Sequence, residues 1–421
     1  MNKQIQTYLD TVCQQVKYRE VHDEIRRELG SHLEDAVEKY TSSGMAEADA
    51  VNAALTDMGD PALVGQQLNK THQPRTEWGL LIATLLFVVL GCWAMYAIEV
   101  GMGSGARPGF FIHKLLWSFA GLAAAAALIF VDYRRLRRYS PLLYAVTLGG
   151  AALLAATVPS LNSSLWGISY TPILFAVALA GIFTDWDWDR PHAVPKAMGL
   201  FAAPLLLYLA HPAAFMEGLE FAAVAAILVW RSRPHRQQAA AMAGAGLTVA
   251  GIAAFRLWNT PHMRYHLIGA LTDPTGEGYM THQSLLTLQQ AGWWGHGLAE
   301  GLPALPGRDS ELVFTFLVHS LGWVAGAAIC CLILFFLRRL ISASRTVRDP
   351  YGASLIVAAA AIFAFRFAWN LLMTVGLLPI AGVDLPFISY GKQGAVQLAL
   401  VGLVLGIFRR KEIIRTAALP Q

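Results

Sequence analysis

The sequence predicts an all-α membrane protein with about ten transmembrane helices, preceded by a small cytosolic helical domain. Of its 421 residues, 55% are hydrophobic and only 14% are charged, whereas about a quarter are charged in an ordinary soluble domain. From Trp78 onward, apolar runs of about 15 to 25 residues alternate with short polar segments, as helices that cross a bilayer require. The charges are unevenly placed, because residues 1–78 carry 8 basic and 13 acidic side chains and residues 79–421 carry 24 and 15.

This composition excludes two classes of protein. The basic residues of the apolar part are too scattered to form the dense positive stripe that a nucleic-acid backbone needs, so no nucleic-acid partner is expected. Disulfide scaffolds are excluded as well, because the four cysteines have none of the spacings of disulfide, zinc or redox frameworks. We interpret all four as packing residues, namely Cys13, Cys92, Cys330 and Cys331.

The polar N-terminal part, residues 1–75, is predicted to be a compact bundle of short helices. It lacks the apolar segment of a cleavable signal peptide, so the N-terminus is expected in the cytosol. Apolar residues recur at helical spacing from Ile5 to Val12 and from Ile25 to Tyr40. A third helix is expected to stop at Gly59, and Asp60-Pro61 suits the start of a short fourth helix.

Most of residues 3–73 resembles the short helical prefix domain found ahead of permeases and other membrane proteins in Gram-positive bacteria. The resemblance is carried by the segments EIRRELGSHLEDAVEKY and MAEADAVNAALTDMGDPALVGQQLNKTH. His22, His32 and the acidic residues form no catalytic arrangement, and we interpret them as solvated helix faces. The domain is therefore expected to be a regulatory or docking module.

The apolar part, residues 76–421, divides into ten predicted spans, and an even number of spans puts both chain ends on one side of the membrane. The connections on that side, with the C-terminal tail, hold 17 of the 24 basic residues, and the opposite connections hold six. By the positive-inside rule both ends are cytosolic, in a bacterial plasma membrane. The spans lie near residues 79–99, 111–131, 140–158, 170–184, 196–211, 217–231, 240–257, 311–337, 352–379 and 392–408.

Two features depart from this regular pattern. Arg366 lies near the middle of the ninth span, where a charge is costly, so it should face a polar cavity, a carboxylate partner or an anionic ligand. The only long connection, residues 258–310, is predicted to lie outside the cell. A loop of that length in an otherwise tightly connected bundle is usually functional.

Two motifs in the last third of the chain are similar to those of the SEDS family (shape, elongation, division and sporulation), which includes FtsW, RodA and SpoVE. In loop 258–310, Gly278-Tyr279, Gln283-Ser284-Leu285 and Gly295-x-Gly297 match the family. The second and more specific motif is DLPFISYGK, Asp384 to Lys392. The family's spacing ahead of that motif is met by Asn370, Gly376, Pro379 and Gly382.

The resemblance implies a peptidoglycan glycan-strand polymerase in cell shape, division or sporulation. Such an enzyme uses a lipid-linked disaccharide-pentapeptide precursor at the outer membrane face, and its implied partner is a monofunctional transpeptidase, a class B penicillin-binding protein. The family's essential carboxylate, an Asp at the end of the loop, aligns with Glu311, and Gly322 keeps the register. Asp309 lies two residues earlier and is the second candidate.

The chemistry that the resemblance implies indicates which groups to look for. Joining a sugar hydroxyl to a lipid-pyrophosphate donor needs a base near the hydroxyl and positive charge near the leaving pyrophosphate. Glu311 or Asp309 is the candidate base, and either acid can also hold a divalent cation as a source of positive charge. The candidate substrate-binding residues are Arg366, Lys392, Arg264, Arg308, Ser389, Tyr390 and Gln283.

Several departures from the family leave other functions open. The third residue of the family's Gly-Tyr-Gln is Met280 here, Lys392 and Gln393 replace small neutral residues, and the polar pair of the fourth span is Ile173-Leu174. Glutamate is one methylene longer than aspartate, and a misplacement of about an ångström can cost about a hundredfold in rate. The alternatives are a non-catalytic relative that scaffolds or regulates wall synthesis, and a transporter of the lipid precursor.

Some of these residues also have purely structural interpretations. Glu311 can be an exposed acid favoured by the dipole of the eighth helix, and Leu385-Pro386-Phe387 can be a re-entrant turn protected by protein. Trp293-Trp294 suits an interfacial anchor. No metal site is predicted from the loop histidines, which lack zinc-site spacing: His262, His266, His282 and His296.

Overall fold

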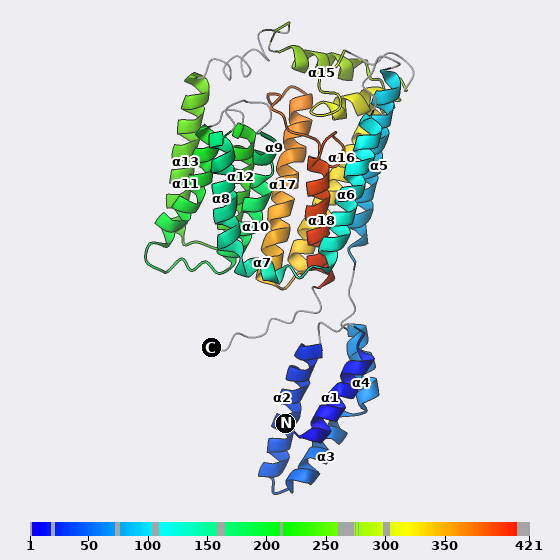
Figure 1. Cartoon of the computed structure of the whole chain (residues 1–421), viewed down its shortest axis with the longest axis vertical. Helices are drawn as coiled ribbons and strands as arrows, with labels where there is room; N and C mark the ends of the chain where they lie inside the picture. The colour runs from blue at the N-terminus through cyan, green and yellow to red at the C-terminus, as the bar shows by residue number, and fades with distance from the viewer. Residues whose placement is uncertain are drawn as a thin grey trace. The chain divides into compact units, whose positions relative to one another are not determined.

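A computed structural model describes residues 2–17, 22–71, 76–102, 109–157, 165–210, 214–259, 273, 275–276, 278–297 and 304–410. These residues form helices and connections without a strand, which confirms the predicted all-α fold. They make up two compact units, which we describe separately (Figure 1). The prefix unit is formed mainly by residues 1–76, and the membrane unit by residues 77–407.

The prefix unit contains four helices, α1 (Lys3–Gln15), α2 (His22–Ser42), α3 (Glu47–Met58) and α4 (Pro61–Thr71). At the start of α1, the Asn2 Oδ1 atom accepts a hydrogen bond from the Gln4 N–H at 3.0 Å, as an N-cap does. The predicted stop at Gly59 and the start at Pro61 are confirmed. The core consists of apolar residues from the helical pattern, among them Ile5, Leu9, Val12, Ile25, Leu33 and Val51.

Ten helices described in the membrane unit lie at the ten predicted spans. Five of them, α5, α6, α11, α16 and α17, are long and apolar enough to cross a membrane, and α8, α10 and α18 are shorter apolar helices. The count of ten spans therefore stays a prediction. The bounds are α5 (Trp78–Gly101), α6 (Phe110–Phe130), α8 (Ser140–Thr157), α10 (Thr171–Thr184), α11 (Ala193–Ala210), α12 (Phe215–Arg231), α13 (Arg236–Asn259), α16 (Val313–Thr346), α17 (Pro350–Thr374) and α18 (Gln393–Arg409).

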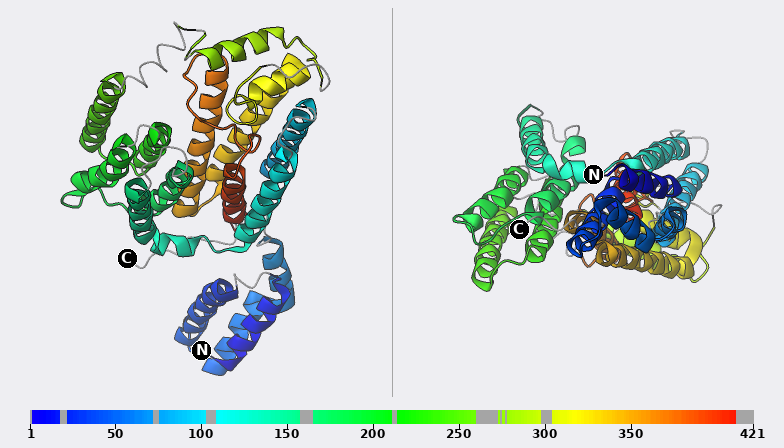
Figure 2. Two further views of the ribbon diagram at one scale, coloured as in Figure 1. Left: turned by 45° about the horizontal axis from the view of Figure 1, so that its top comes forward. Right: turned by 90° about the horizontal axis from the view of Figure 1, so that it is seen from below.

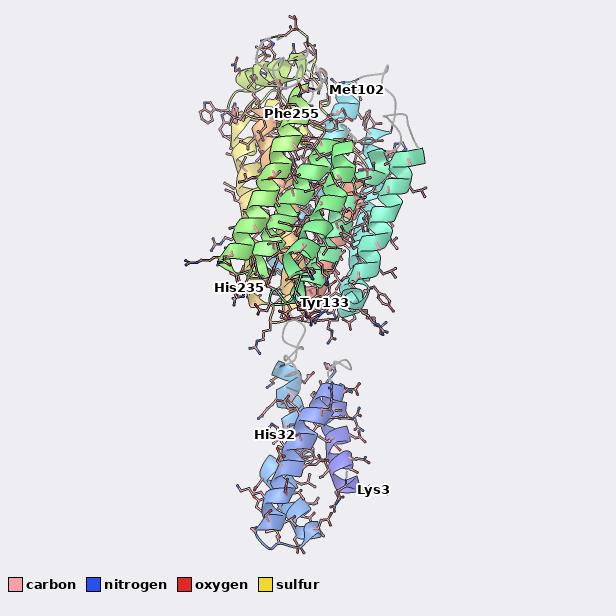
Figure 3. All side chains as sticks on the ribbon, turned by 90° about the vertical axis from the view of Figure 1, so that its left-hand side faces the viewer. Lys3, His32, Met102, Tyr133, His235 and Phe255 are labelled. Atoms are coloured by element: carbon pink, nitrogen blue, oxygen red, sulfur yellow. The ribbon has the colours of Figure 1, made fainter. Side chains whose placement is uncertain are left out.

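The membrane unit has two ends of different construction. The end with Met102 and Phe255 also carries loop 258–310, and we call it the loop end; Tyr133 and His235 lie at the opposite end (Figure 3). Helix α15 (Tyr279–Gln290), which the sequence analysis did not predict, lies within the loop. The remaining short helices are α7 (Arg134–Arg138) and α9 (Leu165–Ile168).

Helix α17 is the centre of the membrane unit, because it packs against α16, α10 and α12. Helix α18 lies between α17 and the pair formed by α5 and α6 (Figures 1 and 2). Small residues allow this close approach: a Cβ added at Gly402 would lie 2.3 Å from the Ala125 Cα, and one at Gly121 would lie 2.7 Å from the Ala395 Cα.

Helix α16 is broken at Gly322, whose φ of 87° lies in the left-handed region that favours glycine. The part of the loop just after α15 bonds to the break, since the His296 N–H donates to the His319 carbonyl and the Gly297 N–H to the Ser320 carbonyl, both at 3.0 Å. Backbone groups freed by the break are thus satisfied inside protein, as a membrane-embedded helix requires. The loop is thereby fixed to the first turns of α16.

Candidate active site

Two non-helical turns meet at the loop end of the membrane unit. The acid turn, residues 307–312, precedes α16, and the DLPFISYG turn, residues 384–391, precedes α18. The Ser389 hydroxyl donates to the Ser310 carbonyl at 2.7 Å, and the Tyr390 N–H donates to the Asp309 carbonyl at 2.7 Å. Segments about 80 residues apart are therefore held as one surface.

The DLPFISYG turn is buried in protein, as its structural interpretation requires, and its re-entrant position in the membrane stays a prediction. Phe387 has a φ of 65°, a rare conformation for a residue other than glycine, so its surroundings must hold it there. Its ring packs among those of Phe87, Phe336 and Phe363, with centroids 5.8, 5.5 and 5.1 Å away. The Phe387 N–H donates to the Gln397 side-chain oxygen at 2.9 Å.

Glu311 is half-buried at the end of the acid turn, one residue before the N-cap of α16. Its carboxylate accepts a hydrogen bond from the Ser310 hydroxyl at 2.7 Å, and its carbonyl accepts one from the Asn370 side-chain amide at 2.9 Å. Gly307 has a φ of 66°, and a Cβ there would lie 2.7 Å from the carboxylate. Glycine at position 307 therefore leaves room for the Glu311 carboxylate. The hydrogen bond from Asn370, on α17, holds the backbone of Glu311 in place.

Asp384 is a third acid of this site, and the sequence analysis quoted it in the motif without giving it a role. The pKa of its carboxyl is raised from an ordinary 3.8 to about 7, because burial disfavours the charged form and the Glu311 carboxylate adds to the effect. The positive charges of Arg366 and Lys114 act in the opposite direction. This acid therefore changes its charge near neutral pH.

Lys114, on α6, is a second site residue that the sequence analysis missed. Its side chain is buried, and its ammonium donates to the Phe387 carbonyl at 2.7 Å and the Ser389 carbonyl at 2.8 Å. A lysine inside an apolar run signals a polar partner. Lys114 clamps the DLPFISYG turn from the side of α6.

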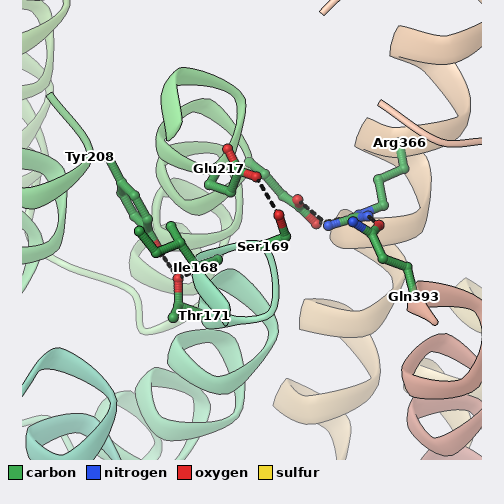
Figure 4. Close-up of polar contacts among 8 residues, drawn as sticks. Ile168, Ser169, Thr171, Tyr208, Glu217, Arg366 and Gln393 are labelled. Atoms are coloured by element: carbon green, nitrogen blue, oxygen red, sulfur yellow. Dashed lines mark hydrogen bonds and ion pairs between the residues drawn. The ribbon is translucent and has the colours of Figure 1, made fainter. Parts of the chain in front are cut away.

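Arg366 has a carboxylate partner, one of the three environments predicted for it. Its guanidinium donates to both Glu220 carboxylate oxygens, at 2.9 and 2.8 Å, and to the Gln393 side-chain oxygen at 2.6 Å (Figure 4). Both members of the ion pair are buried. Three of the five N–H donors of an arginine are thus used by these protein groups.

The polar contacts continue from this ion pair toward α9 and α11. The Ser169 hydroxyl donates to one oxygen of Glu217, and the Thr171 and Tyr208 hydroxyls lie 2.6 Å apart (Figure 4). The other Glu217 oxygen is buried and has no hydrogen-bond partner in the described part of the chain. Glu217 and Glu220 were not predicted as site residues, although acids in an apolar span are a recognisable signal.

The other predicted residues of the DLPFISYG turn are placed as follows. The Ser389 hydroxyl accepts a hydrogen bond from the Leu385 N–H at 2.8 Å while it donates to the acid turn, so it has a structural task. The Tyr390 ring packs edge-on against Phe110, with centroids 5.0 Å apart. The exposed Lys392 ammonium lies 5.6 Å from the centroid of the Trp117 ring.

The remaining predicted residues are only partly described. Asp309 and Arg308 lie in the acid turn and are half-buried. Gln283 is half-buried on α15, next to Ser284, whose oxygen lies 2.8 Å from the Thr374 carbonyl and so ties α15 to α17. Arg264 lies outside the described residues.

The family of this chain is decided by the match of its sequence to a family model. The model for the cell cycle proteins FtsW, RodA and SpoVE matches residues 77–413, which is most of the chain. The chain belongs to the FtsW/RodA/SpoVE family. The predicted family is therefore confirmed, and the match begins where the membrane unit begins.

Curated relatives carry the same family name. A probable peptidoglycan glycosyltransferase FtsW of Geobacter metallireducens is 24% identical over 371 residues, which covers 82% of this chain and 97% of the relative. A probable peptidoglycan glycosyltransferase FtsW of Halorhodospira halophila is 26% identical over 369 residues, with coverage of 78% and 90%.

Solved structures of the FtsW/RodA/SpoVE fold match the chain as well. The RodA rod-shape-determining protein of Thermus thermophilus aligns with a TM-score of 0.57 and 19% identity, over 80% of this chain and 97% of that one. A chain from a peptidoglycan synthase complex that coordinates polymerization and crosslinking aligns with a TM-score of 0.62 and 21% identity, over 80% and 98%. These likenesses support the polytopic membrane fold.

Within this family fold, the site combines acidic side chains just before the start of α16 with the buried cationic side chains Lys114 and Arg366. Among the described residues, no three His, Cys, Asp or Glu side chains are grouped closely enough to hold a metal ion. The predicted divalent cation on Glu311 or Asp309 thus stays a prediction. What the described side chains offer directly is a half-buried carboxylate that can accept a proton, beside positive charge that can stabilise an anion.

Proposed function

We propose that this protein polymerises glycan strands from a lipid-linked disaccharide-pentapeptide precursor, as a peptidoglycan glycosyltransferase. The observation that carries the proposal is the joint surface of the acid turn and the DLPFISYG turn, where the charges of Glu311, Lys114 and Arg366 all act on Asp384. The names of the curated FtsW relatives support the same activity.

In the proposed reaction, Glu311 is the general base. It removes the proton of the acceptor sugar hydroxyl, whose oxygen attacks the anomeric carbon of the donor and displaces the lipid pyrophosphate. The two remaining Arg366 donors and the exposed Lys392 ammonium are the proposed contacts of the leaving pyrophosphate. Asp309 is the alternative base, and dependence on a divalent cation is left to experiment.

The proposed orientation has both chain ends in the cytosol and the loop end outside. It is supported by the 17 basic residues in the connections of the opposite end and the tail, against six at the loop end. The proposed protein partner is a monofunctional transpeptidase, a class B penicillin-binding protein, because the matching chain of a peptidoglycan synthase complex belongs to an assembly that couples polymerization to crosslinking.

The test is a polymerisation assay with purified protein and lipid-linked precursor, with and without candidate transpeptidases. Polymer formation supports the proposal. Precursor that crosses the bilayer of vesicles without forming polymer would favour the transporter. If precursor or transpeptidase binds but neither polymer nor transport is seen, the non-catalytic relative becomes the better account.

A further inference from the structure

A cavity of about 1100 Å³ opens near the opposite end of the membrane unit, where His235 lies. It lies between α10, α12, α16 and α17, next to the connections at residues 185–192, 232–235 and 347–349. None of the predicted site residues lines it. We call it the basic cavity, because three arginines line its mouth: Arg231, Arg233 and Arg345.

The three arginines are exposed and carry no carboxylate partner among the residues that the structure describes. Among the described residues, the three side chains make one hydrogen bond, which is to a neutral group: the Arg231 Nε donates to the Ser354 hydroxyl at 3.0 Å. Elsewhere at this end, arginines do pair with acids, as Arg137 does with Asp185. The mouth therefore concentrates positive charge that the chain itself does not neutralise.

The deeper wall of the basic cavity is apolar and is made of small side chains. It consists of Leu228, Val357, Ala360, Ala361 and Ala364, and several of these are buried. Trp230 and Ile341 also line the cavity, and they are 81% and 46% exposed. Because apolar side chains this exposed on membrane helices face lipid, a hydrocarbon chain can reach the cavity from the bilayer.

One buried donor in the wall lacks an acceptor. The Trp186 indole N–H is buried and has no hydrogen-bond partner among the residues that the structure describes, although its side chain lines the basic cavity. A buried donor without an acceptor is unfavourable, so such groups normally have one. A bound molecule with phosphate or ester oxygens would supply one.

We propose that the basic cavity binds an anionic phospholipid, with its phosphate on Arg231, Arg233 and Arg345 and one acyl chain along the small apolar residues. Cationic pockets between membrane helices on the cytosolic side are suited to such headgroups. In the proposed orientation this end faces the cytosolic leaflet. A soluble anion would leave the apolar wall unused, whereas a phospholipid uses both parts of the cavity and places ester oxygens near Trp186.

The test compares lipid retention by the full-length protein in native mass spectrometry, after exchange into micelles with phosphatidylglycerol, cardiolipin or phosphatidylcholine. We expect the wild type to retain the two anionic phospholipids in preference to phosphatidylcholine. Replacing Arg231, Arg233 and Arg345 together with Gln should lower that retention at least tenfold, the scale of three charge contacts near a membrane surface. The control, Arg338→Gln with Arg348→Gln, changes exposed arginines of the same end that do not line the cavity and should retain lipid normally.

A second variant probes the apolar wall. Ala361→Phe should lower phospholipid retention while all three arginines remain, and thermal unfolding in lipid-free detergent checks that each variant is folded. Retention that is equal for phosphatidylcholine, or unchanged in the folded triple variant, would overturn the proposal. So would a strong preference for a polyprenyl phosphate over both phospholipids, which would assign the cavity to a lipid carrier instead.

Discussion

Toward the loop end of the membrane unit, Arg366 and Lys114 are buried and bound by protein oxygens. At the opposite end, Arg231, Arg233 and Arg345 are exposed and have no acid partner among the described residues. Burial explains the difference, because a charge inside the bundle must be compensated by the chain, while a charge at the membrane surface is solvated. The buried cations, Arg366 and Lys114, are therefore held in fixed positions, as a reaction site requires. The exposed arginines are free to take their counter-ion from outside the chain.

The largest expected effect is the loss of the buried ion pair. Glu220→Gln removes the charge that compensates Arg366, and breaking a buried pair from one side costs about 3–5 kcal/mol of unfolding free energy. Thermal or denaturant unfolding in detergent measures the loss. The matched control is Asp187→Asn, which breaks the exposed pair with Arg190 at the opposite end and should cost about 1 kcal/mol or less. Equal effects of the two variants would contradict the contrast between the ends.

A smaller loss is expected for Lys114→Met, which keeps the length of the side chain and removes its ammonium. The carbonyls of Phe387 and Ser389 would then lack this donor, at about 1–3 kcal/mol for each group left unsatisfied. Unfolding measurements of this variant are compared with Lys392→Met, an exposed neighbour expected to cost about 1 kcal/mol or less. If Lys114→Met is as stable as wild type, the DLPFISYG turn does not depend on this clamp.

The raised pKa of Asp384 predicts that the stability of the folded protein depends on pH. Because its folded pKa is raised from 3.8 to about 7, the protonated form is favoured in the folded state. The contribution of Asp384 to the free energy of unfolding therefore falls as the pH rises from about 4 to about 7, and it is constant above about pH 7. Unfolding temperatures measured from pH 5 to 8 should decrease less in Asp384→Asn than in wild type. Parallel curves for the two proteins would show that Asp384 titrates outside this range.

Removal of the prefix unit is expected to have the smallest effect on the reaction. The acids of this unit lie in helices that have their own apolar core. Deleting residues 1–75 should leave polymer formation by the inserted protein within about twofold of wild type. A fragment of residues 1–75 should be soluble and helical by circular dichroism, because the core is complete without other parts of the chain. An unfolded fragment would contradict the modular account, as would loss of polymer formation in the shortened protein.

Local patterns in the sequence were enough to predict the long apolar helices and the turn before α18. Apolar runs predicted the positions of ten helices, and the motif from Asp384 to Lys392 predicted the turn before α18. Both predictions depend only on residues that are close together in the sequence. The register of Glu311 beside this turn came from the family motif, since no local rule links residues about 80 positions apart.

The partners within the site were not predictable in the same way. Arg366 and Glu220 are 146 residues apart, and Lys114 and Phe387 are 273 apart, so each pairing depends on which helices pack together. Hydropathy gives the position of a span in the chain but not its neighbour. Helix α15 was missed because its polar sequence, YMTHQSLLTLQQ, has no clear apolar stripe.

The central claim is that the joint surface of the two turns holds Glu311 as the base for glycan polymerisation. The most direct measurement is the polymerisation rate of Glu311→Gln, with Glu311→Asp and the opposite-end variant Asp187→Asn assayed beside it. We predict a loss of about a hundredfold or more for Glu311→Gln, the scale of a general base, activity retained in Glu311→Asp, and no change in Asp187→Asn. Wild-type activity of Glu311→Gln would contradict the claim, and its combination with an inactive Asp309→Asn would assign the base to Asp309.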